Sequence, residues 1–196
     1  MDKRIAIPLL FLLASCAFGI PNRKHLTYRI DTAAFKQEQV NGIRIIKGGR
    51  ATVTQSRLPN GEYKEYHLID PGRTALIRDY YATGEIKHQG AMFCGQNYSI
   101  HMFYDKKGDA ITEQQINYEA PYKIGLYDVN RKIRELAKID VFKDKRKLTI
   151  TRTAETSPPV YKAILPITND PAHNRFITIS ANDGSVLSDE IKPAVL

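Results

Sequence analysis

Cys94 is the one cysteine of the chain that could serve as a nucleophile, with His88 or His101 as its base. Such a cysteine attacks as a thiolate, which requires a lowered pKa and a third group that orients the base. Neither requirement has a signature in the sequence. A buried, inert thiol is the simpler interpretation, and a Cys94-dependent hydrolase remains as the remote alternative.

Other catalytic and metal-binding patterns are absent from the sequence. Its five histidines form no HExxH motif and no i, i+4 pair, and neither a GxSxG motif nor a P-loop is found. The sequence therefore predicts no metal site, no cofactor and no enzymatic activity.

The amino terminus indicates a different chemistry. Two cations in "MDKR" precede the apolar run "IAIPLLFLLAS", and Cys16 follows at once. A charged start followed by an apolar segment too short to span a bilayer is typical of an export signal. The four residues Leu13, Ala14, Ser15 and Cys16 ("LASC") resemble the lipobox of bacterial lipoproteins. The resemblance implies removal of residues 1–15 as a signal peptide and lipidation of Cys16, with residues 16–24 as lipidated cysteine and tether.

A lipid anchor would determine where the protein resides. Each buried acyl methylene contributes about 0.8 kcal/mol to membrane binding. Ala17, not Asp, follows the cysteine, and in the resemblance to Gram-negative lipoproteins this favours the periplasmic face of the outer membrane. No later segment has eighteen consecutive apolar residues, so the sequence predicts no transmembrane helix. Lipidation of Cys16 would also leave Cys94 without an intramolecular disulfide partner.

The chain is strongly basic, with 29 Lys and Arg against 21 Asp and Glu and a net charge of +8. Removal of residues 1–15 takes away two cations and one anion, so the net charge becomes +7. In a cytoplasmic protein this charge would suggest nucleic acid as a partner, but export argues against it. We expect instead an acidic protein, anionic lipid or a polyanionic polymer.

Turn signals recur between residues 58 and 108. Gly61, Gly72, Gly84, Gly95 and Gly108 are separated by 11, 12, 11 and 13 residues. This is close to the spacing of short strands joined by tight turns. The sequence therefore predicts an antiparallel β-meander of repeated hairpins over residues 25–126.

Every second turn repeats more closely. Aligning Gly61, Gly84 and Gly108 superimposes "LPNGEYKEY", "YATGEIKHQ" and "DKKGDAITE", and an aromatic pair precedes the last two turns. The pattern in "YYATGEIKHQG" resembles the MORN-variant repeat of the YwqK-like antitoxin family. The resemblance implies successive hairpins with an aromatic face and a protein without demonstrated catalysis, such as an antitoxin that binds a toxin.

The aromatic pairs are the first candidate binding surface. They are Tyr80 with Tyr81 and Phe103 with Tyr104. Strand alternation places the members of each pair on opposite faces, so one of each pair is expected to face outward. Packing of all four in the core is the alternative interpretation.

The periodicity changes after residue 127. Val129, Ile133, Leu136, Ala137 and Val141 form one stripe of an amphipathic helix. We prefer this helix, with Asp128 as N-cap, to a fourth repeat over the same residues. Four segments typical of strands follow, so residues 127–196 are predicted as an α+β region with a small antiparallel sheet.

A basic patch is the second candidate surface. It comprises Arg131, Lys132, Arg134, Lys138, Lys143, Lys145, Arg146 and Lys147. The functional interpretation is contact with an anionic membrane or an acidic partner. The alternative is a solvated helix face and turn.

Together these features predict a mainly β protein with a C-terminal α+β region, anchored to the bacterial envelope and acting by binding. An antitoxin or immunity-like protein with a protein partner is the preferred function. An accessory or scaffold lipoprotein with a basic surface is the alternative.

Overall fold

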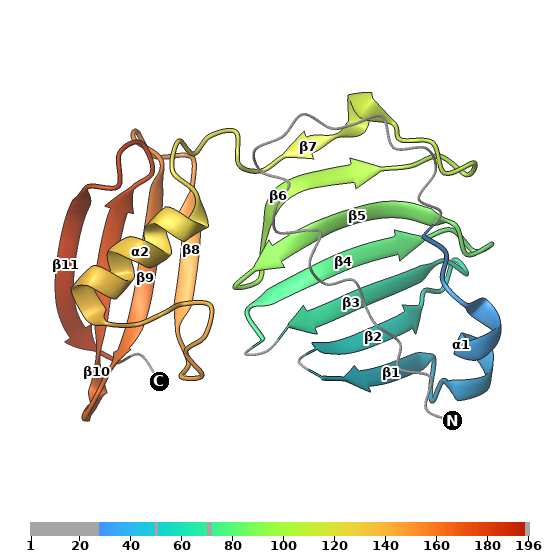
Figure 1. Ribbon diagram of the computed structural model, residues 1–196, viewed down its shortest axis with the longest axis horizontal. Helices are drawn as coiled ribbons and strands as arrows, with labels where there is room; N and C mark the ends of the chain where they lie inside the picture. Colours follow the sequence, from blue (N-terminus) through green and yellow to red (C-terminus); the bar gives the residue numbers. More distant parts are fainter. Residues whose placement is uncertain (1–27, 50, 70–71, 195–196) are drawn as a thin grey trace.

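The computed structural model describes residues 28–49, 51–69 and 72–194, which form two antiparallel sheets side by side (Figure 1). The larger sheet has seven strands in sequential order, and the smaller has four in the order β11-β10-β9-β8. The predicted mainly β architecture, a meander followed by one helix and a small antiparallel sheet, is confirmed. The lipobox and the export signal lie outside the described residues.

The meander follows the predicted hairpin series. Its strands are β1 (Ile43–Gly48), β2 (Ala51–Arg57), β3 (Tyr63–Ile69), β4 (Thr74–Tyr80), β5 (Ile86–Phe93), β6 (Gln96–Phe103) and the short β7 (Ile116–Asn117). All five turn glycines have positive φ, from 81° to 98°. L-residues with a Cβ rarely adopt this conformation, which explains the regular glycine spacing.

At the start of the described chain, residues 28–30 form only an isolated bridge, Arg29 to Glu85, and the helix α1 (Thr32–Glu38) follows. Asp31 caps this helix by accepting the N–H of Ala34 at 2.9 Å. Phe35 packs edge-to-face on Tyr63 with ring centroids 5.1 Å apart. This contact fixes α1 against one face of the meander, and we call the other face the open face.

A 3-10 turn, η1 (Thr112–Gln114), lies between β6 and β7 of the meander, and the C-terminal region contains α2 (Leu126–Ala137) and four strands. The strands are β8 (Thr149–Thr153), β9 (Val160–Ile167), β10 (Asp170–Ser180) and β11 (Val186–Pro193). The helix lies across the small sheet (Figure 1) and buries Val129 and Ile133 completely. Two details differ from the prediction: the N-cap is Gly125, whose N–H bonds to Asp128 in the first turn, and Val141 is buried beyond the end of the helix.

The turns of the meander close one edge of the small sheet. The pairing register of β8 with β9 directs the N–H groups of Ile150 and Arg152 away from β9. Ile150 N–H donates to the Cys94 thiol, and Arg152 N–H donates to the Gln96 side chain at 2.7 Å. Phe93 from β5 joins the buried core of the small sheet. The two sheets therefore share core contacts and hydrogen bonds from backbone N–H groups to side chains.

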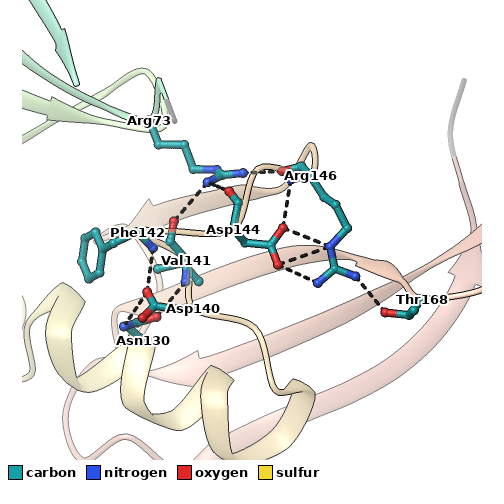
Figure 2. A network of polar contacts seen from close by, with 8 residues as sticks. All are labelled: Arg73, Asn130, Asp140, Val141, Phe142, Asp144, Arg146 and Thr168. Carbon is teal, nitrogen blue, oxygen red and sulfur yellow. Dashed lines mark hydrogen bonds and ion pairs between the residues drawn. The ribbon is translucent and has the colours of Figure 1, made fainter. Parts of the chain in front are cut away.

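Two arginines reinforce this junction. Arg73, in the β3–β4 turn, donates to the backbone carbonyls of Val141, Asp144 and Arg146 (Figure 2). Arg152, from β8, donates to the Glu119 carboxylate and to the carbonyl of Asn97. Each planar guanidinium presents five N–H donors in a fixed geometry, whereas a lysine ammonium presents only three.

We predict that Arg73→Ala destabilises the protein by about 2 kcal/mol, because part-buried carbonyls of the 141–146 loop lose charged donors. Arg73→Lys is expected to restore only part of this loss. The measurement is urea unfolding followed by circular dichroism. Arg57→Ala, at an exposed position of β2, is the control and should change stability by less than about 0.5 kcal/mol. Equal effects of the two alanine variants would contradict the role given to Arg73.

Candidate functional site

The four predicted aromatic residues do not form one exposed stripe. Tyr80 is 2% exposed and lies in the core beside Phe35. Tyr81 and Tyr104 are half-buried, and the Tyr81 hydroxyl donates to the Tyr104 carbonyl at 2.8 Å. Phe103 is half-buried and stacks on His88. Tyr80 therefore belongs to the packing interpretation, because its ring fills the space between α1 and the sheet.

The basic patch divides into paired and exposed cations. Arg131, Lys132, Arg134 and Arg146 form ion pairs with Asp128, Glu135, Asp140 and Asp144. Lys138 ends α2 in the left-handed conformation. Lys143, Lys145 and Lys147 are exposed and make no ion pair with any residue that the structure describes. The helix thus contributes little net charge, and the turn after it contributes three lysines.

Cys94 is a structural residue of the junction. It lies in the β5–β6 turn, accepts the Ile150 N–H, and has its thiol pKa raised chiefly by burial. His88 and His101 bond to each other instead of to the thiol. A raised pKa opposes thiolate formation at neutral pH.

The face that packs against α1 carries a buried polar cluster centred on Glu65. Its carboxylate accepts hydrogen bonds from Gln55 at 2.6 Å, Tyr80 at 2.9 Å and Arg78 at 3.2 Å, and His67 lies 2.6 Å away. Burial alone would raise the pKa of Glu65, but these bonds and charges together lower it to about 2. The register places Gln55, Glu65 and Arg78 in one row across β2, β3 and β4.

The open face carries a second polar chain, which runs from β4 to β6. Asp79 lies 2.9 Å from His88 Nδ1, and His88 Nε2 lies 3.0 Å from His101 Nδ1. His101 Nε2 continues the chain to the carbonyl of Ala91 at 3.1 Å. A bulge in β6 turns His101 over Gly90, where an added Cβ would lie 2.4 Å from the imidazole ring.

The two imidazoles use all four of their ring nitrogens in this series of contacts. Burial lowers the pKa of His101, because it disfavours the charged imidazole. Burial alone would raise the pKa of Asp79, but the His88 hydrogen bond and nearby cations hold it below its usual value.

This arrangement leaves no ring nitrogen of His88 or His101 for a metal ion. Within the described ranges, no group of three or more His, Cys, Asp or Glu side chains could hold one. Phe103 stacks on His88, and the Tyr118 ring lies edge-on to His101 at 4.7 Å. The two imidazoles thus lie beside aromatic rings.

The open face also exposes apolar side chains from β1 and β3, the strands on either side of β2. Ile43, Ile45, Tyr66 and Leu68 are 45%, 59%, 37% and 45% exposed. Registers Ile45↔Thr54, Thr54↔Tyr66 and Tyr66↔Ile77 place them on the same face, with Thr54 of β2 between the β1 and β3 side chains. We call Ile43, Ile45, Tyr66 and Leu68 the apolar patch. Exposed apolar side chains gathered on one face are typical of protein interaction sites.

Sequence reasoning missed both polar clusters and the apolar patch. Asp79 and His88 are cross-strand partners, but no local motif marks them. The contact of His88 with His101 depends on the bulge in β6 and on Gly90. The available signal was alternation within "GIRIIKG" and "YKEYHLI", which places Ile43 with Ile45 and Tyr66 with Leu68 on one face once the strands are in register.

Comparison with protein-family models found no match, and comparisons with curated proteins and with solved structures found none either. Among the helices in the described part of the chain, none has the length and apolar character needed to cross a membrane.

Glu65 predicts a specific acid sensitivity. Its folded-state pKa of about 2 lies below the unfolded value of about 4.3, so its stabilisation is complete above about pH 5 and is lost as pH falls towards 2. The loss is on the order of 3 kcal/mol at about 1.4 kcal/mol per pKa unit. Urea unfolding at pH 6, 4 and 2.5 measures it. The Glu65→Gln variant should be less stable than the unmodified protein at pH 6, and its free energy of unfolding should depend less on pH below pH 5. The Glu113→Gln variant, at an exposed position, should show the same pH dependence as the unmodified protein.

Gly90→Ala tests the position of His101. The added methyl overlaps the imidazole, so we expect a destabilisation of about 1–3 kcal/mol by overpacking. Gly48→Ala is the control, because a Cβ there meets nothing within 4 Å and Gly48 lacks a positive φ. Chemical denaturation of both variants provides the comparison. A Gly90→Ala protein as stable as the control would place His101 elsewhere.

Proposed function

We propose that this protein is a lipid-anchored, non-enzymatic binding protein of the bacterial envelope that holds a protein partner on the open face of its meander. The observation that carries the proposal is the apolar patch on β1 and β3, because four large apolar side chains there are exposed on one face. Chemically versatile side chains near it, His88 and His101, are fully used in internal hydrogen bonds. This supports recognition more than catalysis.

The charges around the apolar patch favour an acidic partner. Lys47 is exposed on β1, and Lys64 lies beside Tyr66 with its ammonium 5.8 Å from the ring centroid. Asp79, the acid of the same face, is engaged by His88 and Lys64. An interface with an apolar centre and cations at its rim is complementary to an apolar surface bordered by carboxylates.

Anchoring follows from the "LASC" motif, with Cys16 as the lipidated residue at the periplasmic face of the outer membrane. An antitoxin or immunity-like function is our preferred form of the proposal, and the resemblance of "YYATGEIKHQG" to the MORN-variant repeat supports it. An immunity protein needs one high-affinity partner and a confined place of action. A membrane anchor would provide that confinement.

An accessory or scaffold lipoprotein is the second candidate. The observation in its favour is the group of exposed lysines Lys143, Lys145 and Lys147. Near an anionic membrane each such cation contributes about 1 kcal/mol. This function predicts weaker, salt-sensitive association with lipid vesicles that is lost when the three lysines are neutralised.

The test combines labelling and capture. The full chain is expressed in a Gram-negative host with labelled palmitate, and Cys16→Ala should lose the label and leave the membrane fraction. Envelope proteins crosslinked to the anchored form are then compared with those of Ile45→Lys. We expect one saturable, one-to-one partner that Ile45→Lys weakens at least roughly tenfold, which corresponds to about 1.4 kcal/mol.

Tyr127→Lys is the matched control, since the Tyr127 side chain is also large and 62% exposed but lies on α2, away from the meander strands. Equal binding by Ile45→Lys and Tyr127→Lys would remove the apolar patch from the proposal. Absence of palmitate label from the unmodified protein would remove the anchor. Growth arrest on deletion, relieved by loss of the partner, would favour the immunity form over the scaffold form.

A further inference from the structure

The outer edge of β11 has unpaired backbone groups. The bond from Ala194 N–H to the Ala172 carbonyl sets the pairing phase of β10 and β11. Residues 188, 190 and 192 therefore bond to β10, whereas the N–H and C=O of Asp189 and Ile191 point away from the sheet. No described residue bonds to those outward groups. The smaller sheet thus ends in an edge that can accept another strand.

The other sheet edges are less suited to strand addition. The outward N–H groups of β8 are taken by Cys94 and Gln96. β7 has only two residues. The start of β1 is bonded to Val40, and β1 has only six residues. β11 is eight residues long and lies on the side of the small sheet away from the meander (Figure 1).

A groove of about 400 Å³ adjoins β11, between the end of α2 and the small sheet. Its lining includes Ala137, Ile139, Leu165, Pro166, Arg175 and Ile191. Ile191 is 65% exposed, and Leu187 on the same strand is 52% exposed. A strand beside β11 can therefore direct alternate side chains towards an apolar cavity.

The polar groups of the groove are already satisfied. Arg175 donates to both carboxylate oxygens of Asp189, at 2.7 and 2.6 Å, and to the Leu136 carbonyl at 2.8 Å. A polar small molecule would have to break this pair. An apolar side chain needs no such exchange, so the chemistry of the lining selects an apolar occupant.

We propose that the β11 edge and the adjoining groove bind an extended segment of a partner protein by strand addition. The segment pairs its backbone with Asp189 and Ile191 and inserts an apolar side chain between α2 and β11. An acidic residue in the segment would face Lys138, the exposed cation between the lining residues Ala137 and Ile139. This site is separate from the apolar patch and does not rest on it.

The probe is a displayed library of twelve-residue peptides, selected against the Cys16→Ala form of the full chain. We expect peptides with alternating apolar residues and at least one acid. Hydrogen exchange should show that a synthesised binder slows exchange of the Asp189 and Ile191 amides. Ile191→Lys should weaken binding at least roughly tenfold, about 1.4 kcal/mol.

Ile191→Pro provides a second variant, because it removes an outward N–H without removing a bond to β10 and proline is tolerated in edge strands. It should also weaken binding, and thermal unfolding should show that both variants remain folded. Ile45→Lys is the control and should bind the peptide normally. The proposal is overturned if no peptide is selected, if binders leave the β11 amides unprotected, or if both Ile191 variants bind normally. Partner capture by the open face is unaffected by any of these results.

Discussion

The junction between the two sheets is the constraint on which the rest of the architecture depends. The outward N–H groups of β8 must be satisfied once that edge is buried, and the β5–β6 turn provides Cys94 and Gln96 for them. Arg73 then ties the neighbouring loop to the meander through three carbonyls (Figure 2). Because both sets of bonds are directional, the sheets cannot rotate about the connection without leaving polar groups unpaired.

This fixed junction determines which surfaces remain for recognition. The β3–β4 and β5–β6 turns of the meander contact the C-terminal region, and one face of the meander packs on α1 around Phe35. The open face and the β11 edge are left on different parts of the molecule. The first offers apolar side chains for a folded partner, and the second offers backbone hydrogen bonds for an extended one.

Signals local in the sequence were sufficient to predict the strands of the meander and α2, but not the contacts between these elements. The meander turns could be predicted because positive φ requires glycine, and α2 because Val129 and Ile133 recur at helical spacing. Asp128 was predicted as the cap one turn too late in the sequence, because the observed cap, Gly125, offers no side-chain signal. Tyr80 could not be assigned to a face, since that depends on α1 covering it. The clusters around Glu65 and His101 depend on strand register and a bulge, which act between segments distant in sequence.

The fate of the chemically capable side chains explains why binding is the function we favour. An enzyme needs a base or nucleophile whose lone pair is available to the substrate. Here Glu65 is held as a carboxylate by three donors, the histidine pair uses all four ring nitrogens, and burial raises the pKa of Cys94. Each of these groups instead makes internal contacts within the fold. Apolar side chains are left exposed on both sheets: Ile45 and Leu68 on one, and Leu187 and Ile191 on the other. Contact with a partner surface would remove their apolar area from water, which is energetically favourable.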